Sequence, residues 1–126
     1  MRSPLPVRTT VEWIRFEHER EPCGVFSYLS DARAALGPEA SRELETLAAW
    51  FSDHLNAPDL LTVERFWFRA EATAHVAQAQ KLAALLRAAG IPIIERRTRR
   101  IPGRVRWEDR HQVAVLTYRD TPQPRR

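Results

Sequence analysis

Cysteine and glycine are scarce in this chain of 126 residues, and each shortage excludes a class of protein. Cys23 is the one cysteine, and a single thiol makes neither an internal disulfide nor a thiolate cage for a metal ion. The four glycines leave little material for a phosphate-cradling loop, and no nucleotide-binding, zinc, calcium or nucleophile-elbow motif is present. The sequence therefore predicts a protein with no cofactor, no metal site and no assignable catalytic residue.

Long apolar runs and an apolar leader are also missing from the sequence. No apolar run approaches the ~18 residues that a membrane-spanning helix needs, and no apolar stretch follows Met1 as it does in a signal peptide. We therefore expect a cytoplasmic protein of bacterial type without membrane contact. Apolar residues make up 44% of the chain and charged residues 29%, which is typical of a globular domain. Residues 1–126 are expected to form a single domain, with flexible ends at 1–6 and 119–126.

Charge is distributed unevenly along the chain. Residues 1–60 contain six arginines and ten acidic residues, a net charge of −4. Residues 61–126 contain fourteen lysine and arginine residues and six acidic residues, a net charge of +8. The positive charge is densest between residues 95 and 110. A basic half of this kind favours polyanions or acidic protein surfaces as partners.

The pattern of apolar residues predicts an α+β fold. Stretches rich in β-branched and aromatic residues indicate strands at 7–18, 25–29, 60–69, 93–100, 104–108 and 111–118. Apolar residues at helical spacing indicate helices at 38–55 and 70–89, with a short helical turn at 32–36. The predicted order ββα-βαβββ corresponds to a two-layer sandwich. We expect a mixed or antiparallel sheet of about five to six strands with two main helices on one face.

Histidine and aromatic residues offer weaker signals of a site. The four histidines are His18, His54, His75 and His111, and a small hydrolase or transferase would require them to converge with carboxylates in one pocket. Phe66, Trp67 and Phe68 alternate between the two faces of a predicted strand. If helices cover one face alone, part of this trio marks a ligand groove or an oligomer interface.

The segment 95–110 carries the strongest hint of a partner. It places arginines and one tryptophan around Pro102-Gly103, a turn signal that predicts pairing of 93–100 with 104–108 as a β-ribbon. Arginine grips phosphate with a planar fork, and an indole offers a stacking surface to bases. The candidate binding residues are Arg96, Arg97, Arg99, Arg100, Arg104, Arg106, Trp107 and Arg110.

Three interpretations of this segment remain open. In the first, the protein is a small basic binding domain whose Arg-rich ribbon contacts DNA or RNA. In the second, the same ribbon serves a protein-interaction module, such as a homodimer or an inhibitor of an acidic partner. In the third, the arginines form ion pairs with the acidic N-terminal half, including Glu12, Glu17 and Glu19, and protect an edge strand from aggregation.

Overall fold

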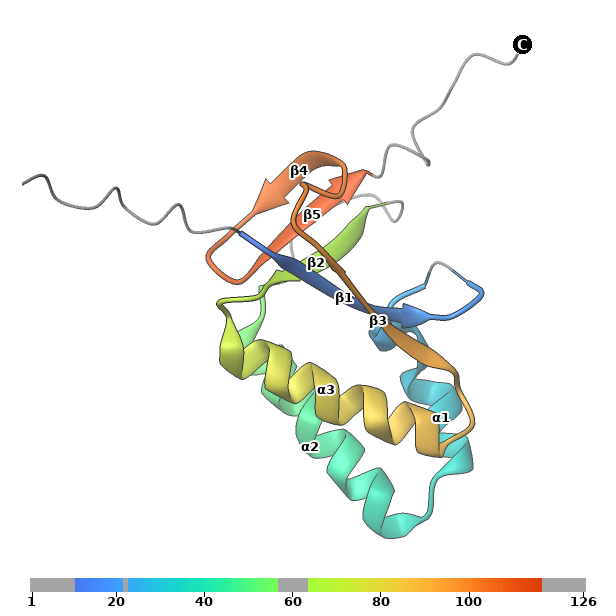
Figure 1. The fold of residues 1–126 in the computed structure, drawn as a ribbon. Coiled ribbons are helices and arrows are strands. Elements are labelled where there is room, and N and C mark those ends of the chain that lie inside the picture. Colours follow the sequence, from blue (N-terminus) through green and yellow to red (C-terminus); the bar gives the residue numbers. More distant parts are fainter. Residues whose placement is uncertain (1–10, 22, 57–63, 117–126) are drawn as a thin grey trace, which may run out of the picture.

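The computed structural model describes residues 11–21, 23–56 and 64–116. Across these ranges the chain forms a five-stranded antiparallel sheet with helices packed against one of its faces (Figure 1). The predicted α+β class and the two-layer arrangement are therefore confirmed. The predicted flexible ends at 1–6 and 119–126 lie outside the described residues, as do the predicted strand residues 7–10, 60–63 and 117–118.

The elements follow one another in the order β1, η1, α1, α2, β2, α3, β3, β4, β5. The strands are β1 (Trp13–His18), β2 (Arg65–Arg69), β3 (Ile93–Thr98), β4 (Arg104–Glu108) and β5 (Gln112–Leu116). The helical segments are the 3-10 turn η1 (Val25–Tyr28) and the helices α1 (Leu29–Ala35), α2 (Pro38–His54) and α3 (Thr73–Ala88). The strands lie in the order β3-β1-β2-β5-β4, so β1 and β2 are interior strands and the arginine-bearing β3 and β4 form opposite edges.

The main hydrophobic core lies between α2, α3 and the sheet. Proline at the first turn of α2 suits the helix start, and Leu44, Leu47 and Phe51 form the buried stripe expected from their spacing. In α3, the buried residues include Ala79 and Ala83 as well as Leu82 and Leu86. The small alanine side chains allow the helix to pack closely on β1 and β3. The two main helices predicted at 38–55 and 70–89 are confirmed.

A second, smaller cluster occupies the opposite face of the sheet. It contains buried Trp67, Val113 and Val115, with Trp13 packed against them. Trp67 and Val113 are directly paired across β2 and β5, which places their side chains on one face. Phe68 belongs instead to the main core, so the aromatic trio of β2 divides between the two faces as its alternation predicts.

The strand predicted at 25–29 is wrong. Val25–Tyr28 forms the turn η1, and Leu29 continues directly into α1. The buried residues Val25 and Tyr28 are three positions apart, which suits a helical turn as well as a short strand. β1 finds its long partner in β3, through six residue pairs from Trp13↔Thr98 to His18↔Ile93. An isolated antiparallel bridge joins Glu17 to Gly24, just before η1.

The β-ribbon predicted from segments 93–100 and 104–108 is also wrong. β3 pairs along its whole length with β1, and β4 pairs with β5. Residues 99–103, which include the Pro-Gly signal, therefore connect one edge of the sheet to the other. This connection passes on the side of the sheet away from α2 and α3 (Figure 1). Long-range pairing with β1 and β5 has overridden the local turn signal.

Gly90 ends α3 in the left-handed region, with φ of 88°. A Cβ at this position would meet no other atom within 4 Å, so the backbone conformation alone determines the cost of substitution. We expect Gly90→Ala to lower the free energy of unfolding by about 1–2 kcal/mol. Asn tolerates this conformation better, so Gly90→Asn should cost less. Urea unfolding of both variants provides the measurement, and equal losses would contradict the backbone explanation.

Candidate functional site

The structure divides the predicted arginine site between four places. Arg96 and Arg97 lie on β3, Arg99 and Arg100 on the connection, and Arg104 and Arg106 on β4. Trp107 also lies on β4, and Arg110 belongs to the turn between β4 and β5. All seven arginine side chains are exposed. Their electrostatic surroundings nevertheless differ, and this difference decides which of them remain available to a partner.

The arginines of β3 are held by carboxylates. The register pairs Arg96 with Arg15 and Arg97 with Ile14, which brings both β3 arginines beside the acidic residues of β1 and its approach. Arg96 forms an ion pair with Glu17. Arg97 Nη1 lies 3.2 Å from Glu12 Oε1, and its Nε lies 2.5 Å from Glu95 Oε2. The hydrogen bond with Glu95 is the main reason that the pKa of Arg97 is raised. Ion pairs with acidic residues of the N-terminal half, as in the third interpretation above, are therefore present for Arg96 and Arg97.

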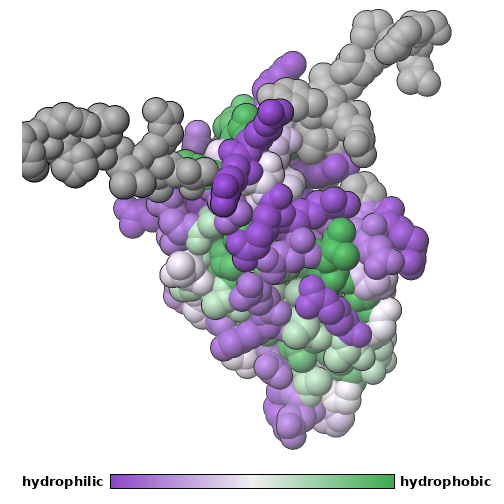
Figure 2. Space-filling view, in the orientation of Figure 1, coloured by the Kyte–Doolittle hydropathy of each residue, from purple (hydrophilic) through white to green (hydrophobic). Residues whose placement is uncertain are grey.

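Four arginines have a different environment, and we refer to them together as the arginine surface: Arg99, Arg100 and Arg104 at the connection between β3 and β4, and Arg110 in the turn beyond the other end of β4. They are exposed, and none of them forms an ion pair within the described part of the chain. A hydrogen bond of 3.1 Å from the backbone N–H of Arg100 to Thr98 Oγ1 orders the start of the connection. Hydrophilic side chains are spread over the face of the molecule that Figure 2 shows.

A β-bulge sets the positions of Arg106 and Trp107. Val105 pairs with Val115 and Trp107 pairs with Ala114, so Arg106 is the extra residue of β4. Its Nε lies 3.9 Å from Oε2 of the buried Glu64, close enough for charge attraction but too far for a hydrogen bond. The ring of half-buried Trp107 lies 6.4 Å from that of Phe66, between centroids. Trp107 therefore offers a partner less free surface than its charged neighbours suggested.

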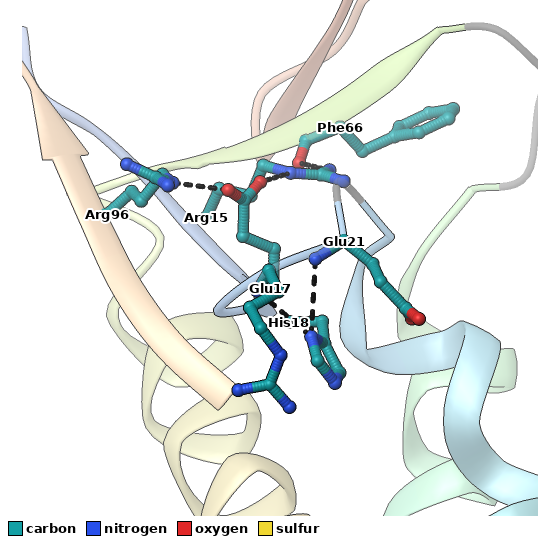
Figure 3. Close-up of polar contacts among 7 residues, drawn as sticks. Arg15, Glu17, His18, Glu21, Phe66 and Arg96 are labelled. Carbon is teal, nitrogen blue, oxygen red and sulfur yellow. Dashed lines mark hydrogen bonds and ion pairs between the residues drawn. The ribbon is translucent and has the colours of Figure 1, made fainter. Parts of the chain in front are cut away.

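A buried charge network lies where β1 and β2 separate (Figure 3). The two strands pair at Trp13↔Arg69 and Ile14↔Phe68 and then diverge. Arg15 bridges the gap, because its Nη1 donates to the carbonyl of Phe66 at 3.0 Å and its Nε donates to Glu17 Oε1 at 2.6 Å. The other oxygen of Glu17 accepts from Arg96. Burial lowers the pKa of Arg15, while the hydrogen bond with Glu17 opposes that change.

Sequence reasoning missed this network, although a signal was present. Arg15 and Glu17 occupy alternate positions in a strand that is otherwise apolar, so both point to the same face. Opposite charges two residues apart on one strand face indicate an ion pair, and both residues are only 6% exposed. The network supports the fold rather than binding, since Arg15, Glu17 and Arg96 satisfy one another.

Three of the four histidines lie close together at one end of the helices. The rings of His75 and His111 stack at 4.1 Å between centroids, and that of His54 stacks on Trp50 at 4.2 Å. His75 Nε2 is hydrogen-bonded to the carbonyl of His54 at 2.8 Å. Burial, together with the nearby His75, lowers the pKa of His111. His18 lies elsewhere, and its Nδ1 accepts hydrogen bonds from the backbone of Arg20 and Glu21 (Figure 3).

Among the described residues, the side-chain hydrogen bonds of His54 and His75 go to backbone carbonyls, of Trp50 and His54 respectively. Asp109 is the nearby carboxylate, and its Oδ1 accepts from the backbone N–H groups of His111 and Gln112 at 2.8 and 3.0 Å. It therefore stabilises the turn between β4 and β5 rather than orienting an imidazole. Among the described residues, no group of three or more His, Cys, Asp or Glu side chains has the geometry to hold a metal ion.

Comparison with known proteins gives no independent indication of function. No protein-family model matches the chain, and no curated protein or solved structure is significantly similar to it. In the parts of the chain that the structure describes, no helix is both long and apolar enough to cross a membrane. The surface and the cavities of this chain are therefore the basis on which a function can be proposed.

The charge network generates a prediction about stability. Glu17→Gln removes the negative charge that balances the buried guanidinium of Arg15. We expect the free energy of unfolding to fall by about 3 kcal/mol or more. Glu95→Gln is the matched control, because Glu95 pairs with an exposed arginine, and its loss should stay below about 1 kcal/mol. Urea unfolding followed by tryptophan fluorescence measures both, and equal losses would show that the network is not critical.

Proposed function

We propose that the protein binds nucleic acid through the arginine surface formed by Arg99, Arg100, Arg104 and Arg110. The observation that supports this most is the absence of carboxylate partners for these four side chains in the described residues, whereas Arg96 and Arg97 are paired. An unpaired guanidinium keeps its full capacity for two parallel hydrogen bonds to a phosphate group. Release of the counterions condensed on the nucleic acid then drives association.

The ion pairs of the individual arginines change which residues we assign to the proposed function. Arg96 and Arg97 would have to leave Glu17, Glu12 or Glu95 before contacting phosphate, so we assign them a minor contribution. Arg106 is attracted to Glu64 and is also a secondary contributor. Trp107 packs partly on Phe66, which limits base stacking to its exposed edge. Binding by this surface is expected to depend on phosphate contacts and to show little sequence preference.

Charge-matched variants test this proposal. Arg99→Gln, Arg100→Gln and Arg104→Gln combined should weaken binding to labelled DNA or RNA by about tenfold or more at low salt. The slope of log K against log salt should decrease by about 2–3, because three phosphate contacts are lost. Fluorescence anisotropy over a salt series measures both quantities for single strands and duplexes.

The matched control removes the same amount of charge elsewhere. Arg20, Arg33 and Arg42 are exposed residues outside the arginine surface, and their combined change to glutamine also lowers the net charge by three. This control should keep most of the affinity. Equal weakening by the two triple variants would mean that net charge alone attracts the polyanion. An unmodified protein that shows no binding at low salt would refute the proposal.

Self-association through β4 is a second candidate function. Within the described ranges β4 pairs with β5 on one side, and its other edge has no strand partner. Val105 on this strand is 40% exposed and Ile101 just before it is 38% exposed, both high values for large apolar residues. Two copies could pair their β4 edges and bury these side chains, forming a sheet that continues across the dimer.

Light scattering distinguishes this candidate from the first. If β4 mediates a dimer, Val105→Lys should produce monomers, because a charge directed into the edge interface opposes pairing. Val105→Thr keeps a β-branched side chain and should leave more of the dimer intact. A protein that is monomeric at every concentration tested would exclude self-association through this edge.

A further inference from the structure

A cavity of about 370 Å³ lies beside the point where β1 and β2 separate. Residues of β1, η1 and β2 line it, together with Gln112 at the start of β5. Its size is within the range of small-molecule sites. The cavity does not include the arginine surface, so it is a candidate site in its own right.

Four of the twelve residues that line the cavity are phenylalanines. Phe16, Phe26, Phe66 and Phe68 all line it. Phe26 is 42% exposed although its ring packs edge-on against Phe51 at 5.0 Å between centroids, which leaves an apolar surface at the edge of the cavity. Several phenyl rings around one space provide apolar contact area and negative ring faces that attract a cation.

Glu64 is the unusual residue of this cavity wall. Its side chain is 0% exposed, and neither carboxylate oxygen has a hydrogen-bond partner among the described residues. Arg106 Nε, at 3.9 Å, is beyond hydrogen-bonding distance, and Arg106 does not line the cavity. A buried carboxylate that receives no donor is strongly unfavourable. Because Glu64 lines the cavity, a donor delivered from the cavity would relieve this cost.

We propose that this cavity binds a small organic amine, with its protonated nitrogen on the carboxylate of Glu64 and its apolar body between the phenylalanine rings. The charge of the amine complements the carboxylate, and its donors supply the missing hydrogen bonds. The aromatic walls favour a flat or aromatic body over a sugar or a phosphate. This site is independent of nucleic-acid binding, since none of the four arginines of the arginine surface lines it.

Probes that differ in one functional group test the proposal on the full chain. We would titrate the protein with 2-phenylethylamine, with 2-phenylethanol and with phenylacetate, and follow backbone amide shifts by NMR. The amine should bind at least about tenfold more tightly than the alcohol, because its hydrogen bond to a carboxylate is charge-assisted. The acid should bind most weakly. The shifted amides should include Phe66, Phe68 and Gln112.

Two variants locate the recognition group. Glu64→Gln keeps the shape of the side chain and should reduce the preference for amine over alcohol to within about twofold. Glu43→Gln, on the exposed surface of α2, is the charge-matched control and should retain the full preference. Equal binding of amine and alcohol by the unmodified protein would overturn the proposal whether or not the variant folds. Absence of shifts in the cavity, or an unchanged preference in Glu64→Gln, would overturn it as well.

Discussion

The position of Glu17 between Arg15 and Arg96 is the interaction on which the arrangement of the sheet most depends. Interior strands normally satisfy their backbone groups by pairing with both neighbours, but β1 leaves β2 after Ile14↔Phe68. Beyond that point, the guanidinium of Arg15 donates a hydrogen bond to the backbone carbonyl of Phe66 in place of a strand-to-strand bond. Glu17 balances this buried charge and joins β1 to Arg96 of β3. One carboxylate thus connects the three strands at the place where regular pairing ends.

The separation of β1 from β2 also creates the space beside them. Arg15, Phe66 and Gly24 all line the cavity, so the residues that close the gap between the strands form part of its wall. A Cβ on Gly24 would lie 3.5 Å from Arg15 Nη2, which shows how closely η1 approaches the guanidinium. Stability and the candidate ligand site are therefore coupled through the same irregularity in the sheet.

The sequence predicted the elements whose signals were repeated over many residues. Helices α2 and α3 have apolar stripes over four or five turns, and Gly90 marks the end of α3 clearly. Val25–Tyr28 is too short for periodicity to separate a strand from a helical turn, and that prediction failed.

The predicted pairing of 93–100 with 104–108 failed because a Pro-Gly signal describes local geometry, whereas strand partners are determined by contacts distant in sequence. Which arginines were paired could not be predicted for the same reason, since it follows from the register of β3 on β1. The unpartnered Glu64 becomes meaningful only when the surrounding phenylalanines are placed in space.

The interior position of β1, between β3 and β2, has a consequence for the order in which the chain can fold during synthesis. This strand is the first described element, but both of its partners belong to the later half of the sequence, at residues 65–69 and 93–98. Until β3 leaves the ribosome, β1, which carries Ile14 and Phe16, lacks one of its two strand partners. The helices α1 and α2 can form in the meantime because their hydrogen bonds are local. Pairings so distant in sequence are slow to form. The nascent chain therefore exposes an apolar strand for longer than a hairpin-first fold would, until β2 and β3 can pair with it.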